Sequence, residues 1–366
     1  MKLHIFNPEH DLALAANLRQ FTAPHAGRQL RSDLAFIPAL WADDGDLVLV
    51  DDIDNARDKV RHISESLVDK VEFVTKAQLE HLLKTEFVDS VQPWGWNLSL
   101  KHELDGLGMP EIALPTDDIL NKVRAISSRE WAAAHLQQGV RYAQSVDEVK
   151  EIAKGWGKAV VKAPWSSSGR GVRYVSADEF RLGGDYPSFD RWVGNIIYRQ
   201  GGVTVEPYYN KVKDFGMEFQ MRDGEICYRG LSLFDTIKNA YSGNILCSEQ
   251  DKEELLMPYV SKGLLDAIRQ HVIEVMQPAL RGIYSGPFGV DMMVYADASG
   301  YKVNDCVEIN LRRTMGHVAL DLTNCLQQMA DEKKGKLSHV MRVEYDGNRY
   351  HLRVMPGRPS EDAPLH

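Results

Sequence analysis

The sequence predicts an N-terminal α/β domain with a parallel sheet, followed by an α+β region built from antiparallel sheets. Two observations support this fold class. In the first third of the chain, short apolar runs alternate with segments of helical spacing, as in a parallel sheet covered on both faces. From residue 158 onward, apolar runs follow one another with short glycine-containing turns between some of them, which is typical of antiparallel hairpins.

The N-terminal third has the elements of a parallel sheet. Strands are expected at residues 2–6, 46–52, 71–74 and 87–94. Asn7 is the predicted N-cap of the first helix, with Pro8 at its first position and Asn17 near its end. A further helix is expected over residues 56–68.

A proline-bearing segment at residues 109–118 is the predicted end of this domain. Beyond it, Ser127 and Glu130 fit a capping box that begins a helix, and Gly139 ends that helix. Later strands are expected at residues 158–163, 172–175, 203–209, 214–221, 225–234, 286–296 and 301–311. A long helix is expected over 261–280, and a C-terminal hairpin over 338–354 turns at Asp346–Gly347.

The composition argues against a protein that binds nucleic acid or membranes. The 366 residues carry a formal net charge of −9, whereas nucleic-acid and anionic-membrane binding call for a basic patch. Four scattered cysteines without a C-x-x-C pair predict reduced core residues rather than a zinc or disulfide framework. The N-terminus lacks the apolar stretch of a signal peptide, and no apolar run reaches membrane-span length. We therefore expect a cytoplasmic protein that binds neither nucleic acid nor membrane.

The stretch Ala159–Val175, "AVVKAPWSSSGRGVRYV", has the composition of a phosphate-binding loop. Lys162 ends the first apolar run, and the serines and glycines of residues 166–171 follow it. A Walker loop has the reverse order, with the glycines first and the lysine last. A dinucleotide-binding fingerprint must open a helix, whereas Val172–Val175 is predicted to be a strand.

A second constellation lies on the two strands predicted at residues 286–311. Asp291 is on the first strand, and Glu308 and Asn310 share one face of the second because they are two residues apart. Two carboxylates and an amide oxygen suit Mg²⁺, which prefers oxygen ligands. Arg312 and Arg313 follow directly and supply cations for a phosphoryl group. The competing interpretation is a solvated sheet face.

In the order and spacing of these motifs, residues Pro115–Leu320 resemble the ATP-grasp superfamily. The resemblance implies a pre-ATP-grasp-like N-terminal domain and two antiparallel sheets that sandwich ATP. It implies the domain bounds 1–114, 115–202 for the small lobe with the glycine-rich loop, and 203–366 for the large lobe. ATP and Mg²⁺ are the implied cofactors, with Mn²⁺ as an alternative ion.

The resemblance also implies site residues. Those implied for ATP are Arg129, Lys162, Ser166, Ser167, Ser168, Gly169, Arg170, Gly171, Glu206, Tyr208, Asp214 and Asn244. Arg129 stands where the family has a second lysine, and Lys122 is the alternative. The metal ligands would be Asp291, Glu308 and Asn310, and the catalytic residues Arg312 and Arg229.

The predicted function is an ATP-dependent ligase that joins a small-molecule or peptide carboxylate to an amine or thiol through an acyl phosphate. One alternative is a small-molecule kinase on the same scaffold, with His10, His317 or Asp235 as the base. The other is a non-catalytic nucleotide-binding module. The "DFG" of Asp214–Gly216 does not indicate a protein kinase, because no H-R-D-x-x-x-x-N motif precedes it. His10 is either a helix-start residue or part of a ligand site. Tyr241 and Asn244 resemble a loop that contacts phosphate in some members of the superfamily.

Overall fold

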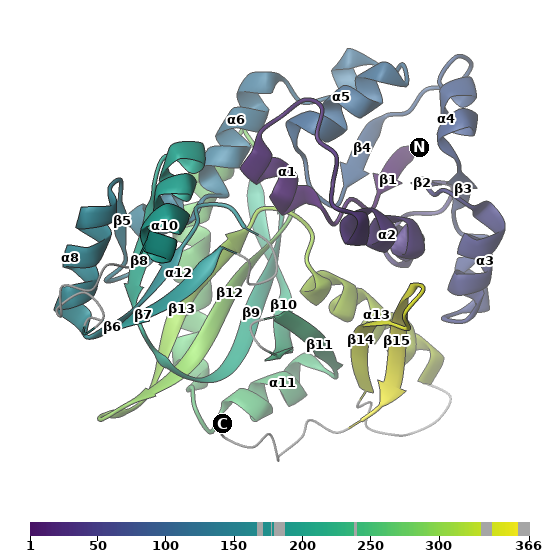
Figure 1. Cartoon of the computed structure of the whole chain (residues 1–366). Helices are drawn as coiled ribbons and strands as arrows, with labels where there is room; N and C mark the ends of the chain where they lie inside the picture. Colours follow the sequence, from purple (N-terminus) through teal and green to yellow (C-terminus); the bar gives the residue numbers. More distant parts are fainter. Residues whose placement is uncertain (167–170, 177, 179–186, 238–239, 331–338, 358–366) are drawn as a thin grey trace.

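The computed structural model describes residues 1–166, 171–176, 178, 187–237, 240–330 and 339–357. Within them the chain forms three sheets, which Figure 1 shows with the helices packed around them. One four-stranded sheet is parallel, and a four-stranded and a seven-stranded sheet are antiparallel. This arrangement confirms the predicted fold class. In the described part of the chain, no helix is long and apolar enough to cross a membrane.

The parallel sheet belongs to the N-terminal domain and has the strand order β3-β2-β1-β4. Its strands are β1 (Lys2–Ile5), β2 (Leu47–Leu49), β3 (Glu72–Val74) and β4 (Ser90–Pro93). The helices between and after them are α1 (His10–Ala16), α2 (His25–Leu34), η1 (Ile37–Leu40), α3 (Ile53–Arg61), η2 (Glu65–Leu67), α4 (Lys76–Leu82), α5 (Leu98–Gly106) and η3 (Glu111–Ala113). The single helix predicted over 56–68 is thus two shorter helical segments.

The first helix begins later than the sequence suggested. We expected Asn7 to cap it, but α1 begins at His10 with Glu9 in the capping position. The Asn7 side chain instead bonds the backbone of Gly95, with its amide donating to the carbonyl at 2.9 Å. Asn7 therefore ties the end of β1 to the end of β4. The helix ends at Asn17 in the left-handed conformation, as expected.

The smaller antiparallel sheet has the order β5-β8-β6-β7. Its strands are β5 (Arg141–Ala143), β6 (Lys158–Lys162), β7 (Val172–Ser176) and β8 (Val203–Pro207), and α8 (Val146–Trp156) and α10 (Pro187–Gln200) pack beside them. The predicted hairpin forms, with Lys162 opposite Val172 at its loop end. The glycine-serine loop therefore leaves the sheet directly after Lys162.

The larger antiparallel sheet has the order β13-β12-β9-β10-β11-β14-β15. Its strands are β9 (Asn210–Arg222), β10 (Glu225–Ile237), β11 (Ala240–Leu246), β12 (Gly286–Asp297), β13 (Gly300–Asn310), β14 (His339–Tyr345) and β15 (Tyr350–Pro356). The helices α11 (Glu249–Leu256), α12 (Lys262–Leu280) and α13 (Met315–Ala330) accompany them. Asp223 and Gly224 both have positive φ in the turn between β9 and β10, as a two-residue hairpin requires.

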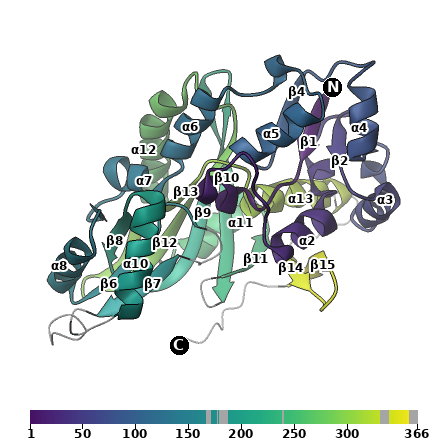
Figure 2. The same cartoon turned by 45° about the horizontal axis from the view of Figure 1, so that its top comes forward.

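Helices α6 (Asp117–Ile126) and α7 (Arg129–His135) lie between the N-terminal domain and the antiparallel sheets (Figure 2). The capping box predicted from Ser127 and Glu130 does not form, and the N-cap lies one residue later. Ser128 is the N-cap and accepts from the Trp131 backbone, while the Ser127 hydroxyl donates to the Val123 carbonyl and ends α6. The cap moves because Ser127 still belongs to the last turn of α6, so that the first residue free for an extended conformation is Ser128.

Hydrophobic packing ties the N-terminal domain to the rest of the chain. Val318, Leu322 and Met341, from α13 and β14, are buried in one cluster with residues of the N-terminal domain such as Leu34 and Val48. This shared core fixes α2 and the end of β4 against the large sheet. The site described next lies at that boundary.

Candidate active site

Lys162 and Glu206 form a buried ion pair in the smaller antiparallel sheet. They lie on the neighbouring strands β6 and β8, where Lys162 is opposite Thr204 and Val160 is opposite Glu206. Their side chains are only 10% and 4% exposed. Because Lys162 directly precedes the glycine-serine loop, its ammonium group could pair with a phosphate in place of the Glu206 carboxylate.

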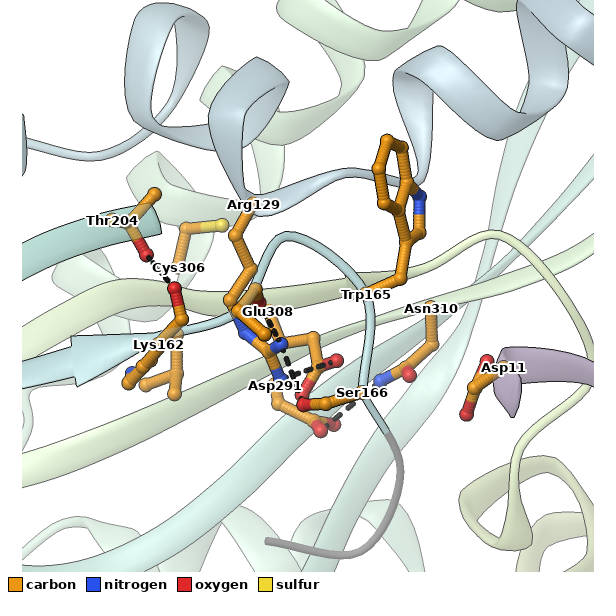
Figure 3. A network of polar contacts seen from close by, with 12 residues as sticks. Asp11, Arg129, Lys162, Trp165, Ser166, Thr204, Asp291, Cys306, Glu308 and Asn310 are labelled. Carbon is orange, nitrogen blue, oxygen red and sulfur yellow. Dashed lines mark hydrogen bonds and ion pairs between the residues drawn. The ribbon is translucent and has the colours of Figure 1, made fainter. Parts of the chain in front are cut away.

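Arg129, at the start of α7, links the start of the glycine-serine loop to β13. Its guanidinium donates to the Ala163 carbonyl at 2.8 Å and to the Ser166 hydroxyl at 2.9 Å, and it pairs with Glu308 at 2.7 Å. The alternative cation Lys122 instead pairs with Asp118 and is half exposed. Of the two candidates, the structure brings Arg129 into the network (Figure 3).

Asp291, Glu308 and Asn310 converge as the sequence predicted (Figure 3). Asp291 on β12 lies directly opposite Glu308 on β13, which places their Cβ atoms about 5 Å apart. The Asn310 amide donates to Asp291 Oδ2 at 3.0 Å. Burial, and then the negative charges of Glu308 and Glu218, raise the pKa of Asp291 to about 8.

This donor set fits a divalent cation. Burial and the negative charges of Glu308 and Glu218 raise the pKa of Asp291, a positive ion nearby would offset that repulsion, and oxygen donors suit Mg²⁺. Among the described residues, no group of three His, Cys, Asp or Glu side chains has the geometry of a metal site. The predicted set consists of two carboxylates and one amide.

Arg312 and Arg313 point to different places. Arg312 donates to both oxygens of Asp11, through Nε at 2.9 Å and Nη2 at 2.8 Å, and to Asn310 Oδ1 at 2.8 Å. Arg313 pairs with Asp321 at 2.9 Å and lies over the Trp41 ring. Arg312 alone of the two therefore reaches the carboxylate cluster.

A cavity of about 580 Å³ opens onto this cluster. Ser166, Asp291, Glu308, Asn310 and Arg312 line one part of it. Its volume is in the range of small-molecule sites.

Sequence reasoning missed Glu218 on β9. This carboxylate is 2% exposed, lines the cavity, and lies 3.0 Å from His317 Nδ1. A Cβ at Gly289 or Gly316 would come within 2.4 Å of its oxygens, so both glycines are needed to admit it. The available signal was strand alternation: Phe215, Met217, Phe219 and Met221 face the core, so Glu218 faces the site.

Asn244 also lines the cavity, and it is 1% exposed on β11. It accepts from the Tyr241 hydroxyl at 2.5 Å and donates to Ser232 Oγ at 2.8 Å. Tyr241 and Asn244 thus belong to a strand rather than to a loop.

Several expected site residues lie apart from this network. Tyr208 is 46% exposed and contacts Tyr174. Asp214 pairs with Lys211 at 2.6 Å. Arg229 is exposed at a bulge of β10 and is not a lining residue of the cavity.

The glycine-serine loop is described only at its ends. Ser167, Ser168, Gly169 and Arg170 lie outside the described residues. Gly171 has φ of +75°, and a Cβ there would lie 2.9 Å from Ser166 Cβ. A glycine is therefore required where the loop returns to β7.

His10 is buried beside the same boundary. Its Nδ1 atom lies 3.2 Å from Asn97 Nδ2, and a Cβ at Gly95 would lie 2.6 Å from its ring. Burial lowers the pKa of His10 to about 4, so the ring is neutral near pH 7. It packs α1 against the end of β4 and so helps to place Asp11.

No protein-family model matches the sequence, and no curated protein matches it. The fold is similar to the biotin carboxylase domain of 2-oxoglutarate carboxylase from Hydrogenobacter thermophilus, in complex with MgADP, ADP and bicarbonate. That likeness has a TM-score of 0.51 and 15% identity, and covers 93% of this chain and 74% of the other.

Two further solved structures are similar. A biotin carboxylase from Campylobacter jejuni, in a β-γ-ATP complex, has a TM-score of 0.50 and 13% identity over 93% of this chain and 75% of the other. A protein from Archaeoglobus fulgidus, described as an ATP-grasp superfamily member, has a TM-score of 0.48 and 12% identity over 98% of this chain and 100% of the other. At these identities the likeness concerns the fold.

Proposed function

Because this chain has an ATP-grasp fold, we propose that it is an ATP- and Mg²⁺-dependent ligase that joins a carboxylate to an amine. One observation carries the proposal: Asp291, Glu308, Asn310 and Arg312, from β12, β13 and the residues that follow β13, line one cavity, and Arg129 of α7 pairs with Glu308. Phosphoryl transfer needs this combination of fixed cations and metal-binding oxygens.

The nucleotide would occupy the space between the two antiparallel sheets. Lys162 and Arg129 would hold its phosphates, since both already pair with carboxylates that a phosphate can replace. Glu206, released from Lys162, would accept from the adenine or ribose. The similar biotin carboxylase domain is in complex with MgADP and bicarbonate, which supports a nucleotide and a small anion as ligands of this fold.

Asp291, Glu308 and Asn310 would hold Mg²⁺, which when bound would neutralise charge on the phosphates. Arg312 would act on the acceptor side. Its guanidinium has five N–H groups, of which Asp11, Asn310 and the Arg313 carbonyl accept four. The remaining N–H on Nη1 would donate to the carboxylate or the transferring phosphoryl group.

The reaction would proceed in two displacements. A carboxylate oxygen attacks the γ-phosphorus of ATP, and the bond to the β-γ bridging oxygen breaks to give an acyl phosphate and ADP. The amine then attacks the acyl carbon, loses a proton to solvent, and expels inorganic phosphate. The chain's contribution is to position the reactants and to neutralise charge.

The test uses hydroxylamine, which converts acyl phosphates to hydroxamates without knowledge of the natural amine. The protein is incubated with ATP, Mg²⁺, hydroxylamine and pooled carboxylic acids. We expect hydroxamate and free phosphate in equal amounts, and loss of both in Lys162→Ala. A phosphorylated product that survives without hydroxamate would instead indicate a kinase, and no ATP consumption with any acid would contradict the ligase.

A further inference from the structure

The cavity that holds the proposed metal ligands extends well beyond them. Its volume of about 580 Å³ is shared by two chemically different ends. The charged end carries Asp291, Glu308 and Arg312. The other end, here called the apolar end, is lined by Phe6, Leu30, Trp94, Met315, Val343 and Tyr350.

The apolar end is assembled from segments that are distant in sequence. Phe6 and Trp94 follow β1 and β4, Leu30 lies on α2, and Val343 and Tyr350 lie on the C-terminal hairpin. All of them lie in or against the same hydrophobic cluster. The apolar end is therefore formed by residues at the edge of the hydrophobic core that joins the N-terminal domain to the large sheet.

Specific contacts hold the apolar end in place. The Tyr350 backbone N–H donates to Asp33 Oδ2 at 2.8 Å, which fastens the hairpin to α2. The Phe6 and Trp94 rings meet edge to face at 5.0 Å. Such contacts favour a preformed pocket over a surface that must fold around its ligand.

Charge is confined to one side of the cavity. Among the described lining residues the charged ones are Asp11, Glu218, Asp291, Glu308 and Arg312, and none comes from α2 or the hairpin. Between the two ends, the polar groups of Tyr241, Asn244 and Ser232 already bond one another. A charged group at the apolar end would lose water and find only neutral partners, such as the Tyr350 hydroxyl and the Trp94 N–H, whereas an apolar group would be stabilised by burial.

We propose that the apolar end binds the body of the carboxylic acid substrate, and that this body is branched aliphatic or aromatic and uncharged. The placement of its carboxylate at the charged end rests on the proposed ligase function. The pocket then selects the acid by the apolar group attached to the carboxylate, and rejects acids that carry a second charge.

Binding is tested first, without turnover. Isothermal titration calorimetry is run with Mg²⁺, a non-hydrolysable ATP analogue, and four acids: 3-phenylpropionate, 4-methylpentanoate, acetate and succinate. We expect the first two to bind at least tenfold more tightly than acetate or succinate, with a negative heat-capacity change, which marks apolar burial. Equal affinity for acetate and 4-methylpentanoate, or tighter binding of succinate, would overturn the proposal.

Variants then locate the binding. Val343→Phe and Leu30→Phe fill the apolar end, so we expect each to weaken binding of 3-phenylpropionate at least tenfold, the effect of losing roughly two buried methylene groups. Glu344→Phe is the matched control, because Glu344 is the next residue of β14 and is exposed. Val343→Ala keeps the fold and enlarges the pocket, and it should shift the preference toward bulkier acids. Unchanged affinity in both Val343 variants would overturn the assignment.

The two proposals fail separately. If an apolar acid binds and the Val343 variants change its affinity, but no acid yields hydroxamate, the pocket assignment is supported and the ligase function is contradicted. If hydroxamate forms equally well from acetate and from the apolar acids, the ligase function stands and the pocket assignment falls.

Discussion

Asp11 and Arg312 form a two-point ion pair between the first helix of the N-terminal domain and the segment directly after β13. Both side chains are more than four-fifths buried. The negative charges of Asp11, Glu308 and Asp291 raise the pKa of Arg312, so the guanidinium stays charged. Because Arg312 also donates to Asn310, one arginine links the N-terminal domain to the proposed metal ligands.

The first prediction tests this pair by a double-mutant cycle. Asp11→Asn should lower the free energy of unfolding by about 2 kcal/mol or more, since Arg312 is left as a buried cation without its partner. Arg312→Met should cost a similar amount, and the double variant less than the sum. Chemical denaturation should show a coupling of about 1–3 kcal/mol. Additive costs would show that the pair contributes little to stability.

The second prediction separates Arg312 from its neighbour. Arg312→Ala should lower kcat by at least about 10²-fold, as removal of one transition-state stabiliser does, and leave KM for ATP nearly unchanged. Arg312→Lys keeps the charge but loses the planar fork, so it should recover only part of the rate.

Arg313→Ala is the matched control. It loses the Asp321 pair and the Trp41 contact, so it should reduce stability and leave kcat within a few-fold of wild type. Hydroxamate kinetics and thermal melts decide the assignment. A severe kcat defect in Arg313→Ala beside a mild one in Arg312→Ala would reverse it.

The third prediction concerns Lys162. Mg²⁺–ATP should raise the melting temperature of the wild type, because a ligand at 100 times its Kd stabilises the native state by about 2.7 kcal/mol. Lys162→Met should lose most of this shift. Lys158→Met, at the exposed start of the same strand, should keep it. A full ATP shift in Lys162→Met would remove this lysine from the nucleotide site.

Strand alternation explains why much of the site could be predicted. Glu308 and Asn310 fall on one face because of their spacing, and the hairpin after Lys162 follows from two apolar runs around glycines. The pairing of Asp291 with Glu308 needs only that β12 and β13 be neighbours, which a short connecting turn ensures. These features are local, so local patterns suffice.

Long-range contacts explain what could not be predicted. Asp11 is 301 residues from Arg312, and no local pattern links the two. Tyr350 reaches the cavity only because the hairpin continues the large sheet beyond β11 and meets α2. Asn7 is a residue type that often caps helices, but its side chain instead donates a hydrogen bond to the Gly95 carbonyl, which is distant in sequence.

The fourth prediction concerns Asp291 in the Mg²⁺-free protein. Its pKa is raised from 3.8 to about 8, so the folded state keeps a proton between these values that the unfolded state has lost. The contribution of Asp291 to stability should therefore fall as pH rises from about 4 to about 8. Asp291→Asn removes this cost and should be more stable than wild type by up to about 4 kcal/mol at pH 7, while losing turnover.

Thermal melts from pH 4 to 9 measure this difference, with Asp58→Asn on exposed α3 as the control. The gain in Asp291→Asn should be small near pH 4 and grow toward pH 8. A variant less stable than wild type at pH 8 would mean that Asp291 is stabilised as a carboxylate in the folded state.

The last prediction concerns His10, whose effect on stability has the opposite sign. Its pKa is lowered from 6.5 to about 4, so between these values the unfolded state binds a proton that the folded state does not. The His10 contribution to stability is therefore lost as pH falls from 6.5 to 4, by up to about 3 kcal/mol, opposite in sign to the Asp291 contribution over the same range. His10→Gln should abolish this loss, whereas His25→Gln, at the exposed start of α2, should retain it. Urea denaturation of the three proteins at pH 4.5, 5.5 and 7 compares the slopes, and a wild-type slope in His10→Gln would show that another group titrates.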